Sequence, residues 1–350
     1  MRLLFARIAL HGGLWLLAFV ALALILQRPF FAAAMVLGSH ALLLAVSRAK
    51  QRVLREPLVF ADLGLFSQAF RHPRLYLPYF GLLRAAAAAA AFVAVIMAGF
   101  WLERADGLAS IVWIPLLVFA IVLLALGTHL ARRELSLDPE KDAARLGVLA
   151  SMWLYWLAER QASRPVAAPF AHLRLGGDAA PHIVVVQSES FFDARRLYAG
   201  VASEVLTNFD ALCGQSESGR LRVPVWGAYT MRTEFAFLSA IPPGELGIHR
   251  FNPYRRFARG GVATIASALR QRGYRTLCLH PYPASFFARD RVFPQLGFDA
   301  FLDIAEFAGA RRAGPYIADA ELTGRITTLL QKAAGPLFVF AITISGVWQP

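Results

Sequence analysis

A carboxylate stands at the end of an apolar, β-branched segment in the second half of the chain. Residues 182–190 read HIVVVQSES, which is typical of a buried parallel strand whose carboxyl end opens into polar surroundings. Ligands of open α/β sheets bind outside the carboxyl ends of the strands, so Glu189 is a candidate binding residue. A structural role, as an acid near the N-terminus of a helix, accounts for Glu189 about equally well.

A hydroxyl further along the chain could act as a nucleophile. Thr230 stands just before a segment, Thr233 to Leu238, that is compatible with a helix. A threonine in that place is most often a helix N-cap. Alternatively, Thr230 forms a phosphoester that the amides of the helix N-terminus and the guanidinium of Arg232 stabilise. The local sequence leaves both interpretations open.

Three more candidates, polar or aromatic, come after the next predicted helix and strand. The segment VATIASALRQRGYRTLCLH predicts a helix, a turn at Gly273 and a strand, which places His280 at a strand end. Phe287 and Arg289 come soon afterwards, and an aromatic ring beside a fork-shaped cation could hold a phosphate ester. An isolated His or Arg is more often structural, so these residues are candidates only.

The elements that must position these residues alternate between strand and helix. An acid-started helix, DAELTGRITTLLQKAAGP, precedes a further apolar strand, PLFVFAITIS. This alternation predicts a layered α/β domain with a mainly parallel sheet over residues 176–350. The carboxyl ends of its strands would carry the candidate residues.

The first part of the chain has a different composition. The whole chain is 57% hydrophobic with a mean hydropathy of +0.49, and its apolar residues concentrate in residues 1–131. Four segments there approach or exceed the roughly 20 apolar residues that cross a hydrocarbon core. We therefore predict a transmembrane domain of about four helices, with spans at Leu4–Leu26, Phe30–Val46, Gly81–Trp101 and Ile111–Ala131.

Residues 132–175 are predicted to be a juxtamembrane linker with one aromatic helix, LGVLASMWLYWL. Basic residues after the second span place that loop inside the cell, so four spans would leave the C-terminal domain inside as well. A short fifth crossing by the aromatic helix would export the domain, although its length suits an interfacial helix better. The number of crossings stays open between four and five.

Charge and cysteine content exclude several classes of protein. The formal net charge is +13, but the basic residues flank hydrophobic segments and form no nucleic-acid-binding motif, so we expect no nucleic-acid partner. Attraction to anionic lipid headgroups explains the excess of basic residues better than nucleic-acid binding does. The chain has two cysteines, which excludes a Cys-rich metal module or a disulfide scaffold.

Four motifs occur in a fixed order: QSES, TMRTEF, GYRTLCLHPYPASFFARDRVFPQLGFD and PLFVFAITIS. In order and spacing they closely resemble the lipoteichoic-acid-synthase-like phosphoglycerol transferases of the sulfatase and alkaline-phosphatase superfamily. The resemblance covers the chain from about residue 180, and the multi-span region with its REPLVFADLGLF loop is also similar to that family. It implies an N-terminal transmembrane bundle followed by an alkaline-phosphatase-like α/β catalytic domain.

The resemblance implies a role for each candidate residue. Glu189 matches the carboxylate that binds the catalytic divalent cation, usually Mn²⁺ or Mg²⁺, and Thr230 matches the threonine nucleophile that also meets this metal. His280, Phe287 and Arg289 fall on positions that hold the phosphoglycerol group. Many members of the family have Trp in place of Phe287, so a smaller stacking surface is expected here.

The implied reaction is a ping-pong transfer. Thr230 would attack the phosphodiester of phosphatidylglycerol, diacylglycerol would leave, and a hydroxyl of a glycan or growing polyglycerol phosphate would take the group. Arg232 has no counterpart in the family that we can assign, although it could hold substrate. The resemblance also implies a cytoplasmic-membrane protein whose catalytic domain faces the periplasm or cell exterior.

The chain departs from the family pattern after its last strand. The family continues with an Asn-His-x-Pro-like segment and later an Asp-His pair of metal ligands, whereas this chain reads SGVWQP and ends. Glu189 and Thr230 alone are too few ligands for a divalent ion. We therefore expect a truncated or frame-shifted form of a longer enzyme, with an incomplete metal site and an incomplete sheet.

Other functions are compatible with parts of the sequence. A phosphoethanolamine transferase of the same superfamily would use the same threonine chemistry. Sulfatase activity is disfavoured because the Cys/Ser-x-Pro-x-Arg signature is absent. A non-catalytic membrane protein, which binds lipid or a partner through a degenerate domain, is the alternative from a different class.

Overall fold

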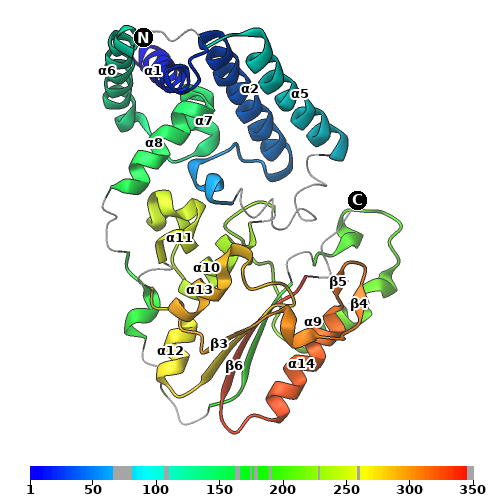
Figure 1. The fold of residues 1–350 in the computed structure, drawn as a ribbon. Coiled ribbons are helices and arrows are strands. Elements are labelled where there is room, and N and C mark those ends of the chain that lie inside the picture. The colour runs from blue at the N-terminus through cyan, green and yellow to red at the C-terminus, as the bar shows by residue number, and fades with distance from the viewer. Residues whose placement is uncertain are drawn as a thin grey trace. The chain divides into compact units, whose positions relative to one another are not determined.

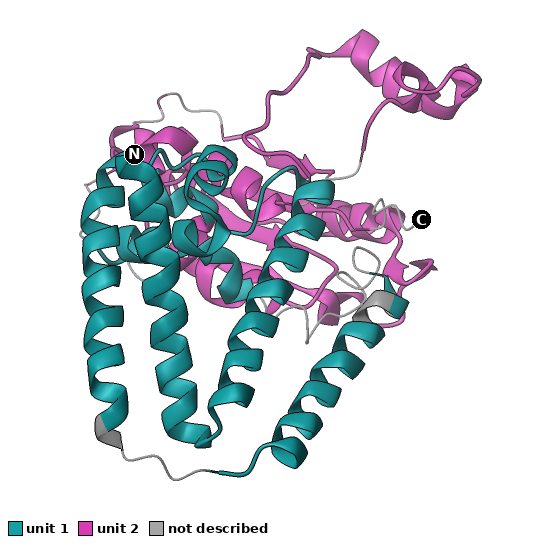
Figure 2. Ribbon diagram, turned by 90° about the horizontal axis from the view of Figure 1, so that it is seen from above, with its two compact units in different colours: residues 1–165, 247–251 teal, residues 166–246, 252–350 magenta. Residues whose placement is uncertain are grey.

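The structure is a computed structural model that divides into two compact units (Figure 2). Unit 1 comprises residues 1–165 and 247–251, and unit 2 comprises residues 166–246 and 252–350. The first part of the predicted linker therefore groups with the N-terminal helices rather than standing alone. The residues that the structure describes are 1–65, 81–105, 110–161, 166–173, 176, 180–188, 191–227, 229–257 and 261–344.

In its described residues, unit 1 is helical, and its four long helices are apolar (Figure 1). Within the described residues, three helical segments are long and apolar enough to cross a membrane: Arg2–Leu26, Pro29–Leu54 and Ile114–Glu134. A shorter apolar segment, Ala86–Leu102, corresponds to the remaining predicted span. The long helices are α1 (Arg2–Leu26), α2 (Pro29–Leu54), α5 (Leu82–Leu102) and α6 (Ile114–Ala131).

Helices α1 and α6 approach each other closely because small residues line their contact. A Cβ atom on Gly13 would lie 2.7 Å from the backbone nitrogen of Leu124, and one on Gly127 would lie 2.8 Å from that of Leu10. Close approach at small residues is a common means of packing helices in membranes, where the hydrophobic effect does not drive helices together. The two glycines thus fix the α1–α6 pair.

The polar segment after α6 folds into two further helices, α7 (Pro139–Leu146) and α8 (Val148–Arg160). The Asp138 side chain caps α7 by accepting a hydrogen bond from the Lys141 amide, and Pro139 occupies the first turn. The buried carboxylate of Asp142 accepts hydrogen bonds from the Tyr155 hydroxyl at 2.9 Å and from Ser136. These bonds hold α8 beside α7 within unit 1.

The loop after α2 is closed by the half-buried side chain of Lys50. The Lys50 ammonium donates to Glu56 at 2.9 Å, to the Pro57 carbonyl at 2.9 Å and to Asp62 at 2.6 Å. These three acceptors use all three ammonium protons. The loop continues into the short 3₁₀ helix η1 (Phe60–Leu65), so the REPLVFADLGLF segment begins with a compact, internally bonded structure.

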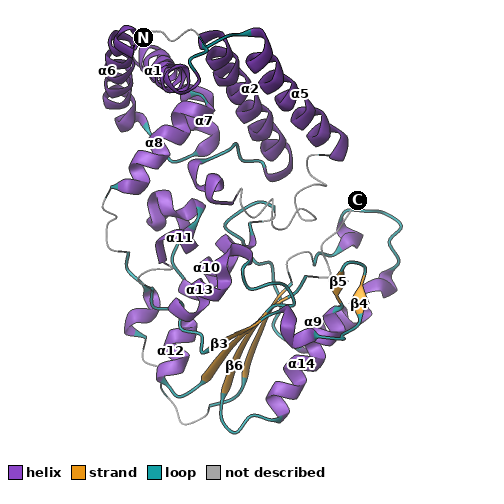
Figure 3. Cartoon of the chain, in the orientation of Figure 1, coloured by secondary structure: helices purple, strands orange, loops and turns teal. Residues whose placement is uncertain are grey.

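Unit 2 contains the parallel sheet that the sequence predicted (Figure 3). Its strand order is β1–β6–β2–β3, and every pair is parallel. A separate antiparallel pair joins two short strands. The strands are β1 (Ile183–Gln187), β2 (Arg275–Leu279), β3 (Ala300–Leu302), β4 (Arg312–Ala313), β5 (Tyr316–Ile317) and β6 (Leu337–Ile342).

Helices pack on both faces of this sheet. On one face, Leu322 and Ile326 of α14 join a core that includes Leu277 and Val339. On the other face, Phe237 of α10 stacks on Phe340 of β6, with ring centroids 5.7 Å apart. The helices of unit 2 are α9 (Thr207–Gln215), α10 (Thr230–Ser239), α11 (Pro253–Phe257), α12 (Ile265–Gln271), α13 (Arg289–Gln295) and α14 (Asp319–Gln331).

Candidate functional site

The carboxyl ends of the parallel strands meet at one edge of the sheet. The His280 amide, directly after β2, donates to the Leu302 carbonyl of β3 at 2.9 Å. The Thr343 amide, directly after β6, donates to the Gln187 carbonyl of β1 at 3.1 Å. Four strands therefore end in register here, and this edge is where a parallel sheet binds its ligands.

The imidazole of His280 is held in one protonation state. Its Nδ1 lies 3.0 Å from the carbonyl oxygen of Ile342, and a carbonyl only accepts, so Nδ1 carries the proton. Burial, and secondarily the charge of Arg289, lowers the pKa of His280 to about 3. The ring is therefore neutral near pH 7, and its Nε2 is a hydrogen-bond acceptor.

Thr230 is the first residue of α10, and the N-cap position belongs to Tyr229. No side-chain cap hydrogen bond occurs at this helix end, so the N-cap interpretation does not describe this residue. Its hydroxyl makes no hydrogen bond to any residue that the structure describes. The half-buried hydroxyl stands beside the amides of the first helical turn, which favour negative charge.

A buried ion pair ties α10 to α13. The Arg289 guanidinium donates through Nη2 to Glu234 Oε1 and through Nε to Oε2 at 3.2 Å. The Tyr254 hydroxyl of α11 also donates to Glu234 Oε2. Arg289 and Glu234 are 1% and 0% exposed, so the pair is fully removed from solvent. Burial, followed by the Glu234 charge, raises the pKa of Tyr254 and keeps it a donor.

This ion pair lies close to the candidate nucleophile along the helix. Glu234 follows Thr230 by four residues, so both side chains share one face of α10, with Cβ atoms about 6 Å apart. Sequence reasoning missed Glu234 and Tyr254. The signal was a glutamate within the apolar helical run TEFAFL, since a carboxylate in such a place needs a buried cation.

The segment before α13 is strained. Phe287 and Ala288 adopt left-handed backbone conformations, with φ of 56° and 54°. Such conformations cost roughly 1–2 kcal/mol for a residue with a side chain. They bring the Phe286 and Phe287 rings to 5.6 and 5.2 Å from the carbon of the Arg289 guanidinium. The structure thus brings the predicted residues Phe287 and Arg289 into direct contact.

Of the two remaining predicted site residues, the structure describes Arg232 but not Glu189. Arg232 is 6% exposed, and its guanidinium lies 3.8 Å from the centre of the Tyr229 ring. Glu189, the predicted metal ligand, lies outside the described residues, as does the final SGVWQP segment. Within the described part of the chain, no group of three or more His, Cys, Asp or Glu side chains could hold a metal ion. The described residues therefore do not make up a metal centre.

Comparison with known proteins identifies the family of this chain. Residues 181–346 match the family described as Sulfatase. The capsular polysaccharide biosynthesis protein RkpI of Rhizobium meliloti (strain 1021) is 30% identical over 365 residues, which cover 95% of this chain and 67% of RkpI. The chain belongs to the sulfatase family, whose members are generally metal-dependent enzymes. The predicted superfamily and its α/β domain are confirmed.

Shorter similarities were also found. A protein of the same organism named for cyclic β-1,2-glucan modification is 27% identical over 172 residues, covering 47% of this chain and 25% of that protein. The lipoteichoic acid synthase LtaP from Listeria monocytogenes has a TM-score of 0.41 and 21% identity over 47% of this chain and 41% of LtaP. The Streptococcus pyogenes phosphoglycerol transferase GacH has a TM-score of 0.40 and 24% identity over 47% of this chain and 45% of GacH.

Proposed function

We propose that this chain is a membrane-bound phosphoglycerol transferase with Thr230 as its nucleophile. The observation that carries the proposal is the position of this hydroxyl at the start of α10, without a hydrogen bond to any described residue. Family membership and the motif order TMRTEF, then PYPASFFARDRVF, support the same assignment. The three helical segments of the described residues that are long and apolar enough to cross a membrane support attachment to the membrane that contains the lipid donor.

The proposed reaction has two displacements at phosphorus. In the first, Thr230 Oγ forms a bond to the phosphorus of phosphatidylglycerol, the bond to the diacylglycerol oxygen breaks, and diacylglycerol leaves with the proton. In the second, an acceptor hydroxyl forms the new phosphoester, the Thr230 ester bond breaks, and Thr230 regains a proton. The amides of the first turn of α10 stabilise charge on the phosphoryl oxygens.

The other residues hold the substrate. His280, neutral with Nε2 as an acceptor, receives a hydrogen bond from a glycerol hydroxyl, and Phe287 stacks against the glycerol carbons. Glu234 and Tyr254 fix the orientation of Arg289, whose positive charge attracts the phosphate. Arg232, three residues into α10, adds a second cation near the helix start.

Glu189 and Thr230 would hold a divalent cation, Mn²⁺ or Mg²⁺, which would supply positive charge beside the phosphoryl oxygens. A glycan acceptor is supported by the two curated relatives, whose names refer to a capsular polysaccharide and to a glucan. Polyglycerol phosphate is the alternative acceptor. A catalytic domain facing the periplasm or cell exterior would meet either one.

The proposal is tested with the full chain in lipid nanodiscs that contain phosphatidylglycerol with labelled acyl chains. We expect release of labelled diacylglycerol in the presence of Mn²⁺, loss of release on chelation, and no release by Thr230→Ala. Thr233→Ala, which removes a hydroxyl from the same helix, should keep most of the activity. Absence of release by the wild type, or equal release by Thr230→Ala, would refute the proposal.

Two further measurements test the lipid donor and the metal ligand separately. Mass spectrometry of the intact chain should detect a glycerophosphate adduct on Thr230 when no acceptor is supplied; an ethanolamine phosphate adduct would show a different donor. Binding of Mn²⁺ should raise the melting temperature of the wild type but not of Glu189→Gln. An equal shift in both proteins would contradict Glu189 as the metal ligand.

A further inference from the structure

Residues 191–227 of unit 2 carry an unusual number of exposed apolar side chains; we name this segment the arm. Soluble proteins rarely gather large apolar side chains on one surface unless that surface binds something. The arm carries α9 and two 3₁₀ turns, η5 (Ala194–Arg196) and η6 (Ser203–Leu206). Its large apolar residues that are at least half exposed are Phe192, Leu197, Tyr198, Val205, Leu212, Leu221, Val223 and Trp226.

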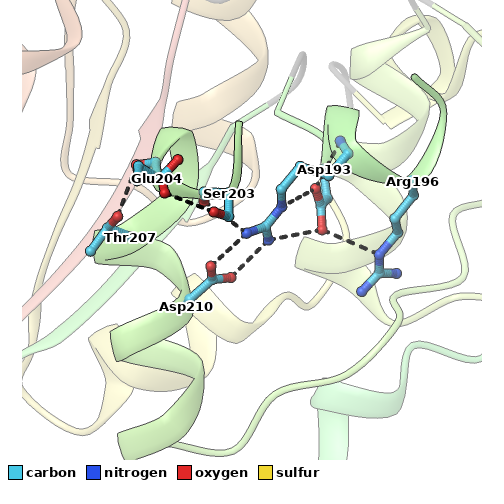
Figure 4. Close-up of polar contacts among 7 residues, drawn as sticks. Asp193, Arg196, Ser203, Glu204, Thr207 and Asp210 are labelled. Atoms are coloured by element: carbon cyan, nitrogen blue, oxygen red, sulfur yellow. Dashed lines mark hydrogen bonds and ion pairs between the residues drawn. The ribbon is translucent and has the colours of Figure 1, made fainter. Parts of the chain in front are cut away.

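The helical part of the arm is held together by an arginine clasp (Figure 4). Arg195 donates to both oxygens of Asp193 at 2.9 and 3.1 Å, to both oxygens of Asp210 at 2.6 and 2.8 Å, and to the Ser203 carbonyl at 3.1 Å. These bonds use all five N–H groups of the guanidinium. They also lower the pKa of Asp193 and Asp210, so both acids stay ionised and compensated by arginine.

The last part of the arm, residues 220–226, combines basic and apolar residues in the order RLRVPVW. Leu221 is 85% exposed and Trp226 is 58% exposed. Neither Arg220 nor Arg222 makes a hydrogen bond or an ion pair with the residues that the structure describes. Glu217 is the nearest acid in sequence before this segment, and no acid follows until Glu234.

We propose that residues 220–226 dock on an anionic lipid surface. The two arginines complement the negative headgroups, while Leu221 and Val223 enter the headgroup boundary and Trp226 lies at the interface, where tryptophan is enriched. The helices of unit 1 keep the chain on a membrane, so this surface is present at high local concentration. The proposal does not depend on the transfer chemistry at Thr230.

The test uses an environment-sensitive fluorophore on Leu221→Cys in the full chain. Cys213→Ser removes the partly exposed native thiol, and Cys278 is buried and remains. The chain is placed in nanodiscs of phosphatidylcholine, with or without phosphatidylserine, an anionic lipid that is not the proposed donor. The control position is Ala334→Cys, which lies in the exposed turn between α14 and β6.

We expect a nitroxide on the lipid chains to quench the fluorophore at residue 221 in phosphatidylserine nanodiscs, but not the fluorophore at residue 334. Arg220→Gln with Arg222→Gln should weaken this docking on the order of tenfold, measured as the ratio of quenched to unquenched populations. Equal quenching without phosphatidylserine would overturn the charge assignment. Protection from aqueous iodide without lipid quenching would mean that protein covers the segment, and would overturn the proposal.

Discussion

Two arginine–carboxylate assemblies in unit 2 have similar bonding but opposite surroundings. Arg289 bonds both oxygens of Glu234 with side chains 1% and 0% exposed. Arg195 bonds both oxygens of Asp210 with side chains 24% and 48% exposed. Each pair joins residues that are separated in sequence, by 55 positions for Glu234–Arg289 and by 15 for Arg195–Asp210, so bonding geometry alone does not distinguish their roles.

Burial distinguishes them. A buried charge that loses its partner keeps its desolvation cost, whereas an exposed charge regains water. The buried pair therefore acts as a rigid link between α10, which begins with Thr230, and the strained turn that precedes Arg289. The exposed clasp holds only the arm. We expect changes in the buried pair to affect the whole of unit 2 and changes in the clasp to remain local.

The largest effect is expected from Glu234→Ala. This change leaves the Arg289 guanidinium and the Tyr254 hydroxyl without their buried acceptor. Losing one partner of a buried ion pair costs roughly 3–5 kcal/mol of unfolding free energy. The measurement is thermal or denaturant unfolding of the full chain in detergent micelles. Glu234→Gln, which retains one acceptor oxygen, should lose less, and a loss below about 1 kcal/mol in Glu234→Ala would contradict the buried link.

The next largest effect is a pH dependence of the unfolding free energy that comes from His280, which lies in the same buried region. Burial lowers its pKa to about 3, whereas the unfolded chain takes up the proton near the ordinary value of 6.5. Between these values the unfolded state binds more protons, so stability is lost as pH falls, by at most about 1.4 kcal/mol per pH unit. His280→Gln should show a weaker acid destabilisation than the wild type. Parallel pH profiles for the two proteins would refute this origin.

The sequence predicted the sheet well because its strands are unambiguous. Residues 183–187 and 337–342 are apolar, β-branched or aromatic runs, and α12, which precedes β2, begins with a capping box formed by Thr264 and Ser267. The four long helices were also predictable from hydropathy. The grouping of residues 132–165 with unit 1 was not, because it depends on packing of the polar segment through Asp142 and Tyr155.

The candidate site was only partly predictable, for a physical reason. Residue types at strand ends indicated His280 and Arg289, but local sequence contains no information about which distant carboxylate meets an arginine. The Glu234–Arg289 contact joins residues 55 positions apart, on α10 and at the start of α13, so it forms only when these helices pack together in the folded domain. The local sequence also allowed Thr230 to be an N-cap, whereas the helix begins at Thr230 itself.

On the exposed side of the comparison, we expect Arg195→Ala to loosen the arm without changing the melting temperature of unit 2. Removing the guanidinium eliminates the hydrogen bonds by which Arg195 links Asp193, the Ser203 carbonyl and Asp210. The measurement is limited proteolysis of the full chain, with cleavage sites mapped by mass spectrometry. Cleavage within residues 191–227 should accelerate. The matched control is Arg196→Ala, because Arg196 meets only Asp193, at 3.4 Å, among the described residues.

The smallest effect is expected from Glu306→Ala, which removes an ion pair with Arg325 of α14. The Arg325 and Glu306 side chains are 34% and 38% exposed, so this pair is in contact with water, like the Arg195–Asp210 pair of the arm and unlike the buried Glu234–Arg289 pair. Exposed pairs of this kind contribute about 0.2–1 kcal/mol. The loss should shrink further at high salt, because screening weakens exposed pairs more than buried ones. If Glu306→Ala destabilised unit 2 as much as Glu234→Ala, burial would not be the property that separates these pairs.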